Sequence, residues 1–113
     1  MSKMSAIVDI LNAAGIPAYL PGRAPGECRT AHAVVTDGGR NREGRTTGRR
    51  MFYVSVYVPE QRPGDLSETV GRVKEALTPL RDIRASGEES GNFFDEDKRA
   101  YGMTVELYIL CAM

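Results

Sequence analysis

The most regular stretch of the chain reads MFYVSVYV over residues 51–58. Strict alternation of this kind predicts a strand, because successive side chains point to opposite faces of a sheet. One face would carry a phenylalanine and three valines, and the other a methionine, two tyrosines and a serine. Since both faces are partly apolar, we expect one to pack on a helix and the other on a neighbouring subunit or a second layer.

Helices are predicted on both sides of this strand. Apolar residues at positions 4, 7, 11 and 14 form one stripe and predict a helix over 5–14, with Gly15 as its C-terminal cap. A longer stripe at spacings of four and three residues predicts a second helix from Leu66 to Leu80. Asp65 and Glu68 have the spacing of a capping box at its start.

Further strands are predicted over 30–36 and 101–111, with a short one around Ile83, and the extended piece over 16–22 is an edge strand at most. Strands that run consecutively on either side of a helix favour an α+β fold. We predict a mainly antiparallel sheet of four to five strands, two helices packed on one face and a long hairpin loop. The length of 113 residues suits a single domain over 1–113.

The composition excludes several classes of protein. The chain has 15 basic and 15 acidic residues, so its net charge of zero argues against a wholly basic polyanion binder. Hydrophobic residues make up 42% of the chain, yet no apolar run approaches the roughly 20 residues of a membrane span. Cys28 and Cys111 are too few for a disulfide scaffold, and we expect two free thiols.

The connection over 37–50 reads DGGRNREGRTTGRR. It is long for a link between two strands, and long loops in small domains are often functional. Its arginines suit bidentate pairing with a carboxylate-bearing partner or contact with phosphates. A solvated hairpin tip is the third interpretation that stays open. The candidate contact residues are the five arginines, Arg40, Arg42, Arg45, Arg49 and Arg50.

Candidate catalytic and metal-binding residues are sparse. His32 is the only histidine and lies four residues after Cys28, across a predicted junction of loop and strand that leaves their geometry open. A structural histidine is the favoured interpretation, and two donors fall short of a tetrahedral zinc site. The carboxylates around residues 88–97 lack the spacing of an EF-hand loop and favour a solvated turn. We predict no catalytic residue, no cofactor and no metal.

Several phrases of the chain resemble one family of phage proteins. GIPAY at 15–19 follows the first helix, FYVSVYV at 52–58 follows the variable loop, and FDEDKRAYGMTVELY at 94–108 leads into the last strand. Together with the helix over 66–80, they are similar to the tail terminators (minor capsid or tail-completion proteins) of bacteriophages with long non-contractile tails. The resemblance covers most of the chain.

The resemblance implies a mechanical function without a reaction. Tail terminators assemble as rings, typically homohexamers, on the head-proximal end of the tail tube. There they stop the addition of tube subunits and help to join head to tail. The implied partners are further copies of the chain, the tail tube protein and a head-completion or connector protein, with DNA passing through the lumen and no membrane. The implied location is the virion tail, after assembly in the host cytoplasm.

A ring subunit needs two complementary faces, because head-to-tail contacts are heterologous. We expect the arginines of 40–50 to meet a partner or face the lumen. The expected subunit contacts are Asp95, Glu96, Asp97, Tyr53 and Tyr57. The alternative is a small nucleic-acid-binding or regulatory α+β module that uses the arginine-rich segment. A small enzyme would need a pocket with perturbed titratable groups near His32 or the carboxylates.

Overall fold

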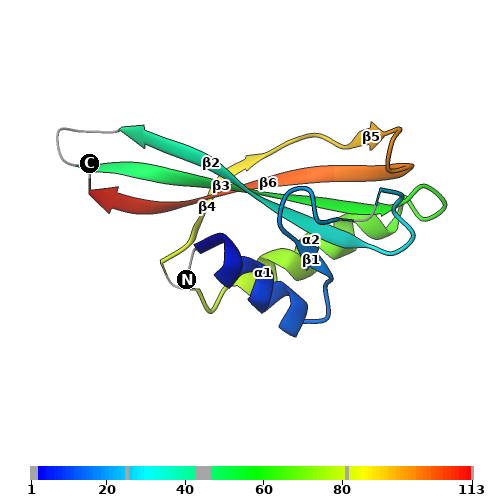
Figure 1. The fold of residues 1–113 in the computed structure, drawn as a ribbon, viewed down its shortest axis with the longest axis horizontal. Coiled ribbons are helices and arrows are strands. Elements are labelled where there is room, and N and C mark those ends of the chain that lie inside the picture. The colour runs from blue at the N-terminus through cyan, green and yellow to red at the C-terminus, as the bar shows by residue number, and fades with distance from the viewer. Residues whose placement is uncertain (1–2, 25, 43–46, 81, 113) are drawn as a thin grey trace.

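The computed structural model describes residues 3–24, 26–42, 47–80 and 82–112, and within its strands it leaves out the side chains of 40–42, 47, 86, 88, 111 and 112. The described chain forms two helices and six strands (Figure 1). In chain order they are α1 (Lys3–Ala13), β1 (Ala18–Tyr19), β2 (His32–Arg42), β3 (Thr47–Pro59), α2 (Asp65–Leu77), β4 (Arg84–Glu89), β5 (Phe93–Asp95) and β6 (Ala100–Ala112).

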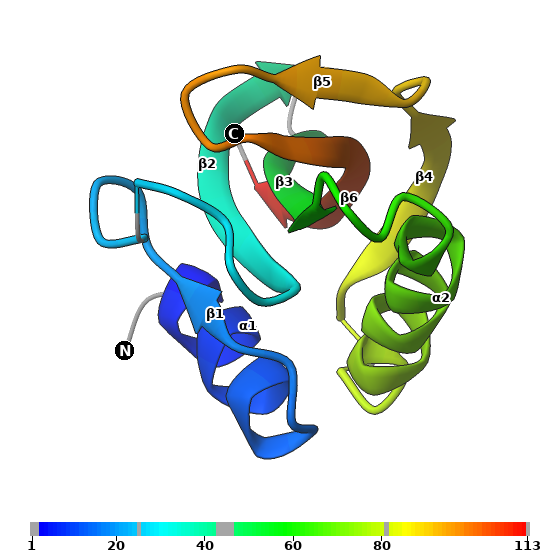
Figure 2. The same cartoon turned by 90° about the vertical axis from the view of Figure 1, so that its right-hand side faces the viewer.

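The strands form one sheet in the order β1-β2-β3-β6-β4, and β5 pairs with β6 off this path. The β1–β2 pair is parallel, whereas all other pairs are antiparallel. Both helices cover the same face of the sheet, and β5 lies beside β6 (Figures 1 and 2). The α+β prediction is therefore confirmed. The sheet has six strands rather than four to five, because the short segments β1 and β5 also pair.

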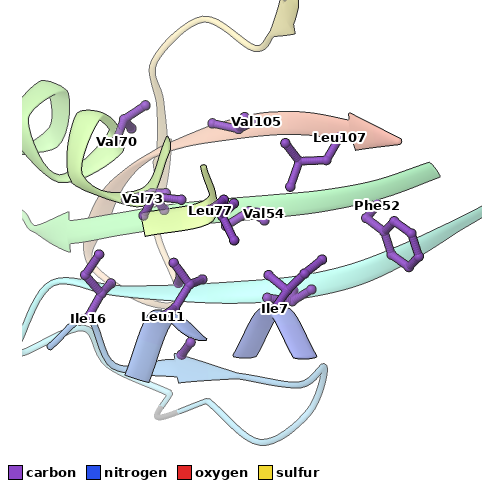
Figure 3. Packing of buried hydrophobic residues seen from close by; sticks show 14 of the residues in the cluster. Ile7, Leu11, Ile16, Phe52, Val54, Val70, Val73, Leu77, Val105 and Leu107 are labelled. Atoms are coloured by element: carbon purple, nitrogen blue, oxygen red, sulfur yellow. The ribbon is translucent and has the colours of Figure 1, made fainter. Parts of the chain in front are cut away.

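The core lies between the helices and one face of β3. Val54 pairs with Val35 of β2 and with Val105 of β6, so that their side chains share the face that the helices cover. Leu11 and Val73 reach this face from α1 and α2 (Figure 3). All five side chains are at most 1% exposed. Burying each contributes about 1.5–3 kcal/mol, so this layer supplies much of the driving force for folding.

Backbone conformation and hydrogen bonding explain where the two helices begin and end. Gly15 has a φ of +84° and allows the amide of Ile16 to donate to the carbonyl of Leu11, as expected for a C-terminal cap. Helix α2 ends at Leu77 rather than Leu80, two residues before Pro79. The capping-box prediction is wrong. Gly64 is the N-cap and makes no side-chain hydrogen bond, and Asp65 lies within the helix.

Residues 37–50 differ from the sequence expectation. Most of this segment extends β2 and β3, whose pairing continues to Arg42 opposite Gly48. The glycines that suggested a strand end form a bulge, because Asp37 pairs with Phe52 whereas Gly39 pairs with Met51. A Cβ at Gly38 would lie 2.3 Å from the Tyr53 ring, so only glycine leaves room for that tyrosine.

The extended strands make the molecule elongated, with extents of 48 × 26 × 24 Å. At one end, β2, β3 and β6 run beyond the helices (Figure 1). We call this three-stranded projection, residues 39–42, 47–50 and 109–112, the arm. Neither described helix is both long and apolar enough to cross a membrane.

Glycines 102 and 71 offer a matched test of this packing. A Cβ at Gly102 would lie 2.8 Å from the Phe93 ring, whereas one at Gly71 on α2 would meet nothing within 4 Å. We expect Gly102→Ala to destabilise the fold by about 1–3 kcal/mol through overpacking. Gly71→Ala should stabilise it by up to about 1 kcal/mol through helix propensity. Urea unfolding midpoints measure both, and equal midpoints would contradict the packing described here.

Candidate functional site

The bulge at the base of the arm is closed by one carboxylate. Asp37 accepts a hydrogen bond from the amide of Gly39 at 2.8 Å and forms an ion pair with the guanidinium of Arg50. Arg50 follows Arg49 on β3, and consecutive residues of a strand point to opposite faces. The partly exposed ion pair is worth about 1 kcal/mol at most. The ion pair joins β2 to β3 at the bulge, so Arg50 already has a partner within the chain.

Arg49 lies on the face of the sheet away from the helices, which we call the helix-free face. Its guanidinium carbon is 4.1 Å from the centre of the Tyr108 ring, which is the geometry of a cation–π contact. Leu110 is the cross-strand partner of Arg49 and is 57% exposed. This face of the arm therefore presents an apolar side chain beside a cation that is stacked on an aromatic ring.

The structure does not place the predicted contact arginines on one common surface. Arg49 and Arg50 point to opposite faces of the sheet, so one flat partner cannot contact both. Arg45 lies outside the described residues, and so do the side chains of Arg40 and Arg42. Of the five candidates, only Arg49 is described on the face that also carries Tyr53 and Tyr57.

The predicted acidic contacts lie at the other end of the molecule (Figure 1). Asp95 ends β5 and accepts a hydrogen bond from the amide of Lys98 at 3.1 Å. Glu96 and Asp97 are exposed in the turn that leads to β6. Lys98 and Arg99 follow in the same turn, so the net charge over residues 95–99 is only −1.

The rings of the two predicted contact tyrosines, Tyr53 and Tyr57, pack against other residues of the chain. The Tyr53 ring packs over Gly38, and the Tyr57 ring stacks on His32 with centroids 5.4 Å apart. Phe93 meets the Tyr57 ring edge-on at 6.1 Å. Both tyrosines are half-buried on the helix-free face. Any subunit contact that they make would therefore add to packing that already exists.

Sequence reasoning left the relation of Cys28 to His32 open, and the structure brings them together. The Cys28 sulfur is 3.6 Å from Nδ1 of His32, and both groups point at the carbonyl oxygen of Thr30, at 3.3 and 3.1 Å respectively. Lys98 joins from the turn, with its Nζ 3.5 Å from Nε2 of His32 and 4.9 Å from the centre of the Tyr57 ring. Sequence spacing gave no signal for Lys98, which is 66 residues from His32.

The hydrogen bonds fix the tautomer of His32. A carbonyl oxygen can only accept, so Nδ1 carries the proton that is donated to Thr30. The lone pair is then on Nε2 and faces the ammonium group of Lys98. Burial lowers the pKa of His32 below its ordinary value of 6.5, and the charge of Lys98 lowers it further, against the Thr30 hydrogen bond. His32 is therefore neutral at pH 7.

This arrangement does not prepare a nucleophile. Burial raises the pKa of the Cys28 thiol, although the charge of Lys98 and a backbone hydrogen bond of Thr30 act in the opposite direction. A cysteine nucleophile needs a nearby base, but Nδ1 of His32 already holds a proton. Across the described ranges of the chain, no three His, Cys, Asp or Glu side chains are grouped as metal ligands would be. The cluster therefore has the chemistry of a buried polar network.

The hollow beside this network has a volume of about 490 Å³. Its lining comes from β1, the start of β2 and the segment before it, namely Pro17, Tyr19, Glu27, Arg29, Thr30 and His32. His32 is only 3% exposed, and its ring meets Tyr19 edge-on at 5.7 Å. Both ring nitrogens of His32 lie against protein groups, Nδ1 against the Thr30 carbonyl and Nε2 against Lys98.

Two comparisons with known sequences identify no relative. No family model matches the chain. The search of curated proteins finds no match either. The resemblance to tail terminators therefore stays a prediction.

The titration of His32 tests the buried network directly. Because His32 is the only histidine, its ring signals in NMR spectra need no assignment. We expect a midpoint below 6.5 and the Nδ1-protonated tautomer. Lys98→Met should raise the midpoint without restoring 6.5, because burial is the larger cause. Arg62→Met, which removes an exposed cation outside the network, is the control and should leave the midpoint unchanged.

The same shift predicts a dependence of stability on pH. The pKa of His32 is lower in the folded than in the unfolded chain, so the unfolded chain binds more protons as the pH falls. The contribution of His32 to stability is complete above its ordinary pKa of 6.5 and decreases as the pH falls through that value toward the folded-state pKa. Urea midpoints from about pH 7.5 to 5.5 should fall in the wild type and fall less in His32→Gln. Parallel curves would contradict this prediction.

Proposed function

We propose that the protein is a structural ring subunit of a phage tail, a tail terminator that caps the head-proximal end of the tail tube. The observation that carries the proposal is the helix-free face of the sheet. The helices cover only one face, and the other continues onto an arm with an exposed leucine (Figure 1). The phrases at 15–19, 52–58 and 94–108 add the resemblance to that family.

Assembly into a ring suits the surface of this chain. A head-to-tail ring needs two different contact regions on each copy. The arm supplies an apolar and cationic region at Leu110 and Arg49, and the turn at Asp95 to Arg99 supplies carboxylates at the opposite end of the 48 Å axis. In this proposal the partners are other copies of the chain, the tail tube protein and a head-completion protein. The ring would act in the virion without chemistry or a cofactor.

Leu110 offers a sharp test of the ring. Its side chain is 57% exposed on the arm, so Leu110→Glu should leave the fold intact while a charge enters the proposed interface. We expect the wild type to form closed oligomers near the size of a hexamer at high protein concentration, as measured by light scattering on a sizing column. Leu110→Glu should remain monomeric under the same conditions.

The control adds the same charge elsewhere. Ser67 is exposed on α2, which lies on the other side of the sheet, so Ser67→Glu should assemble like the wild type. Circular dichroism confirms that each variant is folded. Assembly of Leu110→Glu at wild-type concentration would argue against an interface on the arm.

The second candidate function is nucleic-acid binding by the arm. The observation that favours it is the excess of arginine in the segment 37–50, which contains five arginines and only two acidic residues. A protein that contacts several phosphates loses orders of magnitude in affinity between low and moderate salt. A monomer that retains a labelled DNA or RNA duplex in this salt-sensitive way would favour the second function over the ring.

A further inference from the structure

We propose that His32 and Lys98 form a proton-operated latch, which holds the turn at residues 96–99 against the segment at 28–32 while His32 is neutral and releases it when His32 is protonated. The inference does not depend on the proposed ring, because every group in it belongs to one copy of the chain. It gives a role to the Cys28–His32 pair, which the proposed function does not use.

Two of the contacts that Lys98 makes form the latch. The carbonyl of Lys98 accepts a hydrogen bond from the amide of Cys28 at 2.7 Å, and its ammonium group lies 3.5 Å from Nε2 of His32. The aliphatic part of this side chain reaches across the sheet end, with Nζ 4.9 Å from the centre of the Tyr57 ring. One residue of the turn is therefore tied to the 28–32 segment by both its backbone and its side chain.

The other end of the turn is attached independently. Arg99 forms an ion pair with Glu60 at 2.9 Å, and its carbonyl accepts a hydrogen bond from the Glu60 amide at 3.1 Å. Arg99 also has a φ of +52°, which sets the sharp return of the chain into β6. Loss of the Lys98 contacts would thus free one side of the turn, while the Glu60 side stays fixed and acts as a hinge.

Protonation acts directly on the contact between His32 and Lys98. Neutral His32 offers Lys98 a lone pair on Nε2, because Nδ1 already donates to the Thr30 carbonyl. A proton on Nε2 removes this acceptor and places a second positive charge 3.5 Å from the ammonium group. Like charges at this distance repel strongly in a partly buried site. The lysine, at the surface end of the pair, is the group that can move into water.

Among the residues that the structure describes, no carboxylate is paired with His32. The groups that face it are the Cys28 thiol, the Thr30 carbonyl, Lys98 and the rings of Tyr19 and Tyr57. Glu27 and Arg29 line the hollow beside it, and Asp95 acts electrostatically on Tyr57. Among the ion pairs of the described residues, none joins His32 to an acid. Its pKa below 6.5 is consistent with this environment.

A released turn would change what the surface presents. Asp95, Glu96 and Asp97 lie directly before Lys98, and the amide of Lys98 donates to Asp95. Movement of Lys98 would therefore alter the position of these carboxylates. The inferred latch couples mildly acidic pH to the position of the carboxylates at residues 95–97.

Hydrogen exchange of three backbone amides tests the latch in the wild-type chain. The Cys28 amide donates across the latch, the Glu60 amide donates at the hinge, and the Ser90 amide donates to Thr104 elsewhere in the sheet. Protection factors, corrected for the pH dependence of intrinsic exchange, are compared at about pH 7.5 and 5.5. We expect Cys28 to lose several-fold protection, with Glu60 and Ser90 unchanged. About tenfold is the largest loss that one histidine of ordinary pKa 6.5 can produce at pH 5.5.

The variant His32→Gln keeps a hydrogen-bond acceptor but cannot be charged. Its Cys28 amide should show the same protection at both pH values. Should this variant fail to fold, the three wild-type amides still decide the question. The latch is overturned if Cys28 keeps its protection while the NMR signals of His32 report protonation, or if His32 stays neutral at pH 5.5. Equal losses at all three amides would also overturn it, because they indicate general destabilisation.

Discussion

The central strand β3 is the constraint on which the rest of the structure depends. It is hydrogen-bonded to β2 on one side and to β6 on the other, and its pairing with β6 runs from Thr47 to Pro59. Its alternate side chains are buried beneath both helices. A slip of one residue would move every valine to the helix-free face and expose the core, so burial fixes the register of all three long strands.

This constraint leaves the two sheet faces with different roles. The helix-covered face is an apolar layer that contributes stability. The helix-free face carries rings and polar groups, and it continues past the helices onto the arm (Figure 1). At the base of the arm, the Gly38 bulge admits the Tyr53 ring and brings Asp37 to Arg50. The opposite end holds the network of Cys28, His32 and Lys98.

Charged side chains have different environments at the two ends of the molecule. Arg50 forms an ion pair and Arg49 stacks on a ring within the chain, and the described parts of the basic segment, 37–42 and 47–50, belong to two paired strands. At the other end, the ammonium group of Lys98 approaches the buried ring of His32. The contact between Lys98 and neutral His32 is sensitive to protonation of the histidine. An exposed ion pair such as Arg99–Glu60 contributes little to stability and responds weakly to pH in this range.

Much of the fold could be predicted from local pattern alone. The period of two at 51–58, the stripe from Leu66 and the glycine at 15 specify their elements, because burial of one face and a positive φ are local requirements. The strand extension through 37–50 could not be predicted. Its glycines normally end a strand, and only pairing with β3 and the Tyr53 ring makes a bulge favourable.

The sequence by itself determined the α+β class, both helices, the central strand and the candidate arginines. Only the tertiary structure decided which of those groups meet. Lys98 reaches His32 across 66 residues, Asp37 reaches Arg50 across 13, and Arg49 and Arg50 separate to opposite faces. The physical reason is that periodicity records which side of an element is buried, whereas contacts between distant residues depend on strand register and on the packing of the whole sheet.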